Sequence, residues 1–198
     1  SFRQRGVKLC AAFLLVILLA ACGTQGENKP QTKTDEKGFY SYDGYVVKTD
    51  YPLDEDSVNK AAEKIKNIYD MYLEGTNVQA YYSIVPDKNY CIGAEAGIDT
   101  IDYKKMVDLM KLKTDYMPYL DITGLLGITD YYKTDAHWRQ EKITDVAAKL
   151  AEAMGVSLNA EDETKEAKAN FVGAYSRHFD VTAATETYTF FHHVALAT

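Results

Sequence analysis

Apolar residues recur at helical spacing in three stretches of the chain, each with polar residues between them. The stretches cover residues 58–72, 103–110 and 143–154, and Gly75 and Gly155 follow the first and the third. This spacing places the apolar side chains of each stretch on one helix face, and a glycine is typical of a helix end. We therefore predict three amphipathic helices. The last should turn four side chains inward: Ile143, Val146, Leu150 and Met154.

Other apolar runs have the length and composition of β-strands. Residues 78–85 are rich in Val, Tyr and Ile and stop at Pro86, which is typical of a central strand buried on both faces. Residues 119–122 and 188–191 predict shorter strands, and Asp43-Gly44 predicts a hairpin. Helices that alternate with strands favour an α/β fold, in which helices cover both faces of a mostly parallel sheet.

Two stretches without an apolar period are predicted to lack strands. Residues 92–98 contain two Gly and two Ala and predict a loop over a cleft, and the charged residues 159–170 predict a solvated loop or short helix. Lys88 and Asn89 lie just past the predicted strand 78–85, where open parallel sheets bind their ligands. They are therefore either substrate-binding residues or part of a polar turn.

The first residues have the order of a lipoprotein signal. Arg3, Arg5 and Lys8 precede the apolar residues 9–19, and small residues then lead to Cys22. This order predicts a signal peptide over 1–21, lipid on Cys22, a polar tether over 22–37 and a domain over 38–198. The protein should then be extracytoplasmic and anchored to a bacterial cell membrane. The alternative is an ordinary secretory signal or a short anchor with an incidental cysteine.

Charge and cysteine content narrow the classes of partner and site. The net charge is −7 and becomes more negative once the basic leader is removed, which argues against nucleic acid as a partner. Cys91 would be the one cysteine left besides Cys22, so we interpret it as a small core residue. The Cys and His spacings match no metal motif, and we expect neither metal nor cofactor.

Acid–base groups are densest between Asp130 and Glu141, which also hold the only tryptophan, Trp138. Asp135 and His137 are two residues apart, so a turn can place the carboxylate against one imidazole nitrogen and leave the other facing a cleft. In the alternative interpretation Asp135 or Thr134 caps a helix that begins at once, His137 is a surface residue in its first turn and Trp138 packs on the core.

The stretch Tyr-Tyr-Lys-Thr-Asp-Ala-His-Trp-Arg-Gln-Glu at 131–141 resembles the motif of the DHHW family, with Ala136 at the second motif position. Val-Pro-Asp-Lys at 85–88 and Phe-Val-Gly-Ala-Tyr-Ser at 171–176 are similar to other family segments. The family resembles SGNH hydrolases, close to the O-acetylation proteins of bacterial alginate synthesis. The resemblance implies a three-layer α/β/α domain in which His137 is the base, Asp135 orients it and a later serine is the nucleophile. Lys88, Asn89 and Trp138 would bind substrate.

No serine of this chain lies in a Gly-Asp-Ser or Gly-x-Ser-x-Gly sequence, which are typical surroundings of a nucleophilic serine. Ser176 is the least implausible candidate among them. We expect the family's nucleophile block to lie beyond the last residue, so that the domain is incomplete and inactive as given. The predicted function is O-acyl (acetyl) transfer or ester hydrolysis on an envelope polysaccharide. The alternatives are a non-catalytic envelope lipoprotein that binds carbohydrate or an assembly partner, and a zinc site formed by Asp135, His137 and His178.

Overall fold

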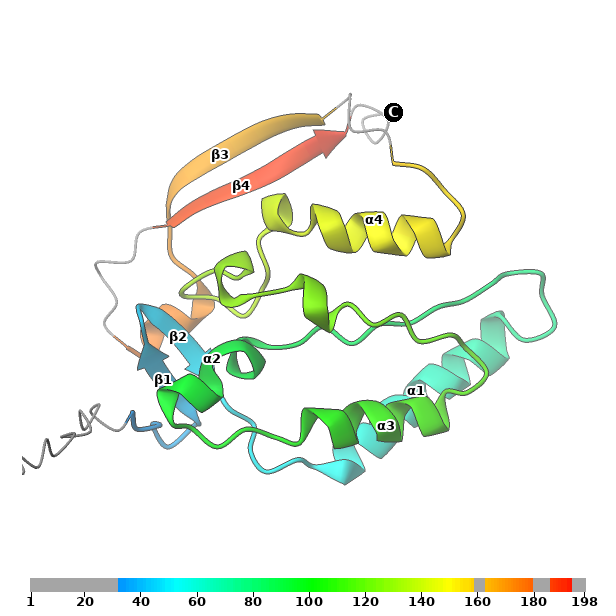
Figure 1. Ribbon diagram of the computed structural model, residues 1–198, viewed down its shortest axis with the longest axis horizontal. Helices are drawn as coiled ribbons and strands as arrows, with labels where there is room; N and C mark the ends of the chain where they lie inside the picture. Colours follow the sequence, from blue (N-terminus) through cyan, green and yellow to red (C-terminus); the bar gives the residue numbers. More distant parts are fainter. Residues whose placement is uncertain (1–31, 159–162, 180–185, 194–198) are drawn as a thin grey trace, which may run out of the picture. The chain divides into compact units, whose positions relative to one another are not determined.

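The computed structural model describes residues 32–158, 163–179 and 186–193 (Figure 1). The predicted signal peptide, Cys22 and most of the predicted tether lie outside these ranges. The helices are α1 (Glu55–Tyr72), α2 (Lys88–Ala96), α3 (Tyr103–Lys113) and α4 (Thr144–Ala153), and the strands are β1 (Phe39–Tyr42), β2 (Tyr45–Lys48), β3 (Glu163–Phe171) and β4 (Glu186–His193). Short 3₁₀ turns are η1 (Thr123–Leu125), η2 (Ile128–Asp130), η3 (Gln140–Lys142) and η4 (Ala174–Arg177). None of the helices in these ranges is long and apolar enough to span a membrane.

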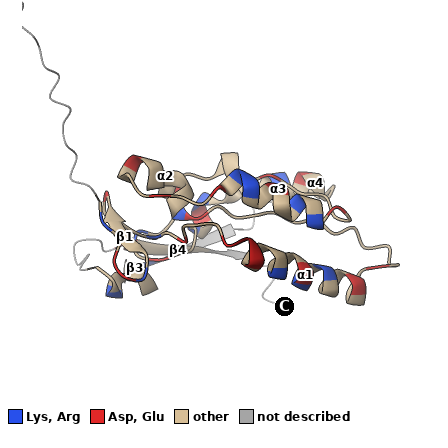
Figure 2. Ribbon diagram, turned by 90° about the horizontal axis from the view of Figure 1, so that it is seen from below, with Lys and Arg blue, Asp and Glu red and all other residues tan. Residues whose placement is uncertain are grey.

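Helices α1 and α3 confirm two of the predicted helices and pack against each other (Figure 1). Aspartates cap both: Asp54 accepts a hydrogen bond from the amide of Ser57, and Asp102 accepts one from the amide of Lys105. Figure 2 shows acidic and basic residues along both helices. Ala62 of α1 and Met110 of α3 are the buried residues of the two helices, whereas Ile68 and Tyr72 of the predicted α1 stripe are exposed.

Helix α4 confirms the third predicted helix but corrects its orientation at one end. Val146 is buried in a cluster with Ile122, Leu126 and Tyr131, and Ile143 and Leu150 pack against that cluster. Met154 is 54% exposed, so its predicted inward position is wrong. It follows the last helical residue and caps the helix, where the chain already turns away from the core.

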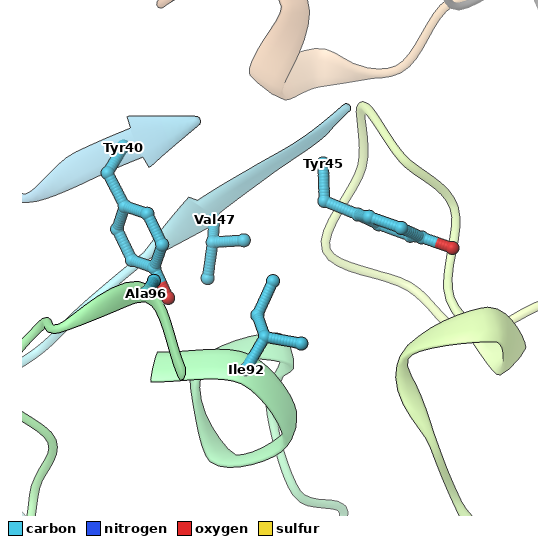
Figure 3. Packing of buried hydrophobic residues seen from close by; sticks show 5 residues of the cluster. All are labelled: Tyr40, Tyr45, Val47, Ile92 and Ala96. Atoms are coloured by element: carbon cyan, nitrogen blue, oxygen red, sulfur yellow. The ribbon is translucent and has the colours of Figure 1, made fainter. Parts of the chain in front are cut away.

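Strands β1 and β2 form the hairpin predicted by Asp43-Gly44, and they pack on α2. Asp43 and Gly44 both have positive φ, at 48° and 77°, as a two-residue hairpin turn requires. Figure 3 shows Tyr40 and Val47 of the hairpin facing Ile92 and Ala96 of α2. The hairpin thus supplies one of the buried hydrophobic clusters.

Helix α2 replaces the predicted loop over 92–98, and that prediction was wrong. The carboxylate of Asp87 caps α2 by accepting the amide of Tyr90 at 2.8 Å, and Gly97, with φ 71°, ends it. Gly93 lies inside the helix, and a Cβ at this position would come within 2.6 Å of Asn89 Oδ1, which leaves no room for a side chain. The glycine that favoured a loop is therefore required by close packing.

The predicted buried strand over 78–85 was also wrong in extent. Val78 and Val85 are exposed, and the only strand-type pairing of this run is a parallel bridge between Tyr82 and Tyr119. The Ser83 hydroxyl donates to the Leu120 carbonyl at 2.7 Å. That carbonyl is the acceptor for the next rung of a parallel ladder, so the side chain competes with backbone pairing. The predicted strand over 119–122 is likewise limited to this bridge.

Strand β4 confirms the strand predicted over 188–191, and its antiparallel partner is the charged strand β3. The prediction of a loop or short helix over 159–170 was therefore wrong for residues 163–170, and residues 159–162 lie outside the described ranges. Side chains 167–170 of β3 are exposed, so this part of the strand buries no apolar face that would show as a period in the sequence. The described residues thus form a mixed α/β fold with two small antiparallel sheets, in which the mostly parallel sheet is not seen.

Candidate functional site

The motif forms a closed loop rather than the first turn of a helix. Tyr131 and Trp138 form an antiparallel bridge, and the Tyr132 amide donates to the carbonyl of His137 at 3.1 Å. Helix α4 begins only at Thr144. Asp135 and His137 therefore lie at the tip of a loop, and Asp135 caps no α-helix.

The structure brings Asp135 and His137 into direct contact. Asp135 Oδ1 lies 2.5 Å from His137 Nδ1 and also accepts the His137 amide at 3.1 Å. Asp135 Oδ2 accepts the amide of Ala174 at 3.0 Å. The carboxylate is mostly buried, whereas the His137 side chain is 82% exposed. This geometry holds a proton on Nδ1 and leaves Nε2 open to a reactant.

The surroundings of Asp135 keep its carboxylate ionised. Burial acts to raise its pKa, but the amide of Ala174 and the amide and ring of His137 outweigh burial, so the pKa lies below its ordinary value. An ionised carboxylate next to Nδ1 stabilises a positive charge on the imidazole. The pair can therefore accept a proton at Nε2.

A cleft of about 500 Å³ adjoins the pair, and its walls are largely aromatic. It is lined by Tyr132, Asp135, His137, Trp138, Gln140, Ile143, Phe171 and Tyr188. Trp138 also packs on the cluster that contains Val146, so the motif loop joins the cleft to the core. Burial, followed by the nearby carboxylate of Glu141, raises the pKa of Tyr132 to about 12, and that phenol stays protonated.

Sequence reasoning missed Phe171 and Tyr188 as cleft residues. They come from β3 and β4. The Phe171 ring is tilted against that of Tyr132 with a centroid distance of 4.7 Å, and the Tyr188 ring stacks on it at 5.9 Å. Phe171 lies in the segment 171–176 that resembles the family, which was the one signal available for it. Tyr188 reaches the cleft only because β4 pairs with β3.

Lys88 and Asn89 are the first residues of α2 and are almost fully buried. Asn89 accepts a hydrogen bond from the Tyr40 hydroxyl at 2.7 Å, and its amide donates to Thr49 at 3.3 Å. The Lys88 ammonium donates to three backbone carbonyls. Neither residue lines the cleft beside His137. Substrate binding by Lys88, Asn89 or Trp138 remains a prediction.

Ser176 does not act as a partner of His137 in this structure. Its hydroxyl donates to the carbonyl of Gly173 at 2.8 Å. Within residues 32–158, 163–179 and 186–193, no hydroxyl is hydrogen-bonded to the imidazole. The described residues therefore supply a base with its orienting carboxylate, and no nucleophile bonded to that base.

The structure does not bring together the three residues of the alternative zinc site. His178 stacks on Phe39 and lies 3.4 Å from Asp35, so it is not grouped with the Asp135–His137 pair. Among the residues that the structure describes, no cluster of three His, Cys, Asp or Glu could hold a metal ion.

Cys91 is half-buried, and burial together with nearby carboxylates raises the pKa of its thiol to about 11. It is thus a poor nucleophile at neutral pH.

No protein-family model and no curated protein matches the sequence, but the fold has relatives of known structure. A DHHW family protein from Eubacterium siraeum superposes with a TM-score of 0.60 and 16% identity, over 82% of this chain and 57% of that chain. PatB1 from Bacillus cereus, solved with a sulfonyl adduct, gives a TM-score of 0.62 and 14% identity over 83% of this chain and 58% of PatB1. A second PatB1 structure gives 0.57 and 16%.

The chain thus spans less than two thirds of the length of these structures, and at this identity the likeness concerns the fold. The similarity extends over more than four fifths of this chain in both comparisons. The chain shares its fold with a DHHW family protein and with PatB1, in agreement with the resemblance at 131–141.

Proposed function

We propose that the protein transfers or hydrolyses acyl esters, in particular acetyl esters, on a polysaccharide of the bacterial envelope. The observation that carries the proposal is the contact between Asp135 and the Nδ1 of an exposed His137, beside an aromatic cleft. This is the arrangement that a base of acyl transfer needs, because the carboxylate fixes the tautomer while Nε2 receives the proton.

In the proposed mechanism Nε2 of His137 takes the proton from a serine hydroxyl as its oxygen attacks the ester carbonyl. The protonated imidazole, stabilised by Asp135, then gives that proton to the leaving alkoxide as the ester C–O bond breaks. A sugar hydroxyl or water attacks the acyl-serine in the second half, with the same proton movements. The serine would come from outside the described residues. PatB1 was solved with a sulfonyl adduct, and the formation of such an adduct on an activated nucleophile would fit a covalent mechanism for this fold.

The aromatic walls of the cleft support a carbohydrate substrate. Trp138, Phe171 and Tyr188 offer ring faces within one cleft, and sugar rings stack on such faces through their C–H groups. A neutral or weakly charged acyl sugar also suits a protein whose net charge is −7, which would repel anionic polymers. The proposal also includes the three-layer SGNH arrangement with its parallel sheet. The parallel bridge between Tyr82 and Tyr119 supports this part of the proposal.

Anchoring by lipid on Cys22 is part of the same proposal. It would place the cleft on the outer face of the cell membrane, next to the polysaccharide. The predicted tether over 22–37 would give the domain reach between the membrane and the polymer.

The test is ester turnover by the protein expressed from its complete reading frame. p-Nitrophenyl acetate and an acetylated envelope polysaccharide serve as substrates, and released acetate is measured. We expect His137→Ala and Asp135→Asn to lower kcat by about 10²–10⁴-fold. Asp121→Asn is a matched control, because Asp121 accepts the amide two residues on, as Asp135 does, but lies outside the cleft. It should retain full turnover.

Two outcomes would change the proposal. Turnover by residues 22–198 alone that disappears in Ser176→Ala would identify Ser176 as the nucleophile. No turnover by the folded full-length protein on either substrate would favour the alternative of a non-catalytic envelope lipoprotein that binds carbohydrate or an assembly partner.

A further inference from the structure

The backbone just before Asp135 is held from two sides by buried side chains of opposite charge. Lys88 contacts carbonyl groups of residues 132 and 133, and Glu186 contacts amide groups of residues 133 and 134. Lys88 is 3% exposed and Glu186 is 7% exposed. Charged side chains are rarely this buried in proteins, and both of these bond the same stretch of backbone, residues 132–134.

The Lys88 ammonium has as many acceptors as it has protons to donate. It donates to Tyr132 O at 3.0 Å, to Lys133 O at 3.1 Å and to Val46 O of β2. Burial lowers its pKa to about 8, although Glu186 and Asp135 act to raise it, so the group is charged at neutral pH. With all three N–H groups engaged, Lys88 has none to offer a substrate.

Glu186 of β4 satisfies the opposite side of the same peptide groups. Its Oε2 accepts the Lys133 amide at 2.6 Å and the Thr134 amide at 3.2 Å. The Thr134 hydroxyl in turn accepts the amide of Gly173 at 2.8 Å. The backbone entering Asp135 is thus fixed by α2, β2 and β4, and each bond is buried or partly buried.

We propose that Lys88 and Glu186 are positioning residues that hold the motif loop so that Asp135 meets Nδ1 of His137. This inference rests on the proposed role of the pair as a base. Without the ammonium, the Lys133 carbonyl would keep the Val46 amide as a donor at 2.8 Å, but the carbonyls of Val46 and Tyr132 would lose the Lys88 donor while buried. The loop would then shift so that these carbonyls reach water. A shift of about 1 Å is enough to misplace a proton-transfer group.

The primary test reads the His137 ring itself in the full-length protein. Imidazole ¹⁵N chemical shifts report whether Nδ1 carries the proton that faces Asp135, and Asp135→Asn defines the spectrum without the carboxylate. We expect Lys88→Met to move the His137 signals toward that reference. Met110→Ala, a buried substitution in α3, is the control for general loss of stability and should leave them unchanged.

Chemical rescue separates the charge from the packing. Lys88→Ala removes the side chain beyond Cβ, which corresponds to a propylammonium ion. Added propylammonium should restore the His137 signals, and 1-propanol, which has a similar shape without the charge, should not. Equal rescue by both compounds, or rescue by neither, would overturn the role of the charge.

The kcat and KM of Lys88→Met, compared with its His137 signals, distinguish the positioning role of Lys88 from the proposed ester chemistry. We expect Lys88→Met to lower kcat roughly 10²-fold with KM unchanged. A raised KM with unmoved His137 signals would mean that Lys88 contacts substrate, and the positioning role would be wrong. Moved signals in a protein that turns over no ester would support positioning and contradict the proposed function. If Lys88→Met does not fold, Glu186→Gln decides: signals that stay in place would overturn the inference.

Discussion

Gly173 is a point at which a second chain segment lies very close to the motif loop. A Cβ at this position would lie 2.5 Å from the Cβ of Asp135 and closer still to the carbonyl of Thr134. Its φ of −82° suits any residue, so only this close approach requires glycine. We expect Gly173→Ala to lower the free energy of unfolding by about 1–3 kcal/mol and to shift the loop.

Urea denaturation and the His137 ring signals measure the two effects of Gly173→Ala. Gly124→Ala is the matched control, since a Cβ there meets no atom within 4 Å. The control should match the natural protein in both measurements. A Gly173→Ala protein with natural stability and signals would show that the loop yields at no cost.

Lys88 gives the stability of the protein a defined pH dependence. Burial lowers its pKa from an ordinary 10.5 to about 8 in the folded state. Below pH 8 both states hold the proton, and the cost of burying the charge is fully present. Between about pH 8 and 10.5 the unfolded chain holds the proton and the folded chain has lost it, so the contribution of this group to stability rises with pH.

The measurement is the free energy of unfolding of the natural protein minus that of Lys88→Met, from pH 7 to 10.5. We expect this difference to be flat below pH 8 and then to rise by roughly 3 kcal/mol, because each pKa unit corresponds to about 1.4 kcal/mol. Other lysines and tyrosines cancel in the subtraction. A difference that stays flat up to pH 10.5 would mean that the folded state does not lower the Lys88 pKa.

At the scale of elements, α4 carries the contact between the motif loop and the core. Val146 is buried against the cluster that Trp138 also contacts, whereas Met154 is exposed at the helix end. We expect Val146→Ala to cost about 2 kcal/mol in the free energy of unfolding, from lost apolar burial and the cavity left behind. Met154→Ala should change it by less than about 0.5 kcal/mol. Thermal or urea unfolding of the two variants checks this, and equal costs would contradict the assigned helix face.

The hairpin of β3 and β4 contributes side chains both to the cleft and to the anchoring of the motif loop. Phe171 and Glu186 are paired in its register, so one position supplies a ring to the cleft and the other a carboxylate to the loop. Lys168 lies over the ring of Phe190 at 5.8 Å, which shields part of an apolar side chain with a charged one. The hairpin therefore lines one wall of the cleft and anchors the loop.

At the scale of the whole molecule, the proposed anchor is tested by the fate of Cys22. We expect Cys22→Ala to abolish incorporation of labelled palmitate and to move the protein from the membrane to the soluble fraction, because the lipid would be attached to this thiol. Cys91→Ala is the control and should remain labelled. Unchanged labelling of Cys22→Ala would contradict the lipoprotein proposal.

The sequence by itself determined the features that depend on neighbours along the chain. Helices α1, α3 and α4 were predictable because their apolar stripes and ends are local patterns. The contact of Asp135 with His137 was predictable because a turn joins side chains two residues apart. Asp87 and Gly97 also marked the ends of α2, but the glycine inside that helix favoured a loop.

Only the tertiary structure decided the features that depend on distant partners. The Ser83 hydroxyl competes for the Leu120 carbonyl beside the single parallel bridge of 78–85, and β3 is a strand because β4 pairs with it. The roles of Lys88 and Glu186 arise from contacts with residues more than forty positions away in the sequence. Such contacts leave no period in the sequence, since their energy comes from burial and hydrogen bonds that exist only once the segments meet.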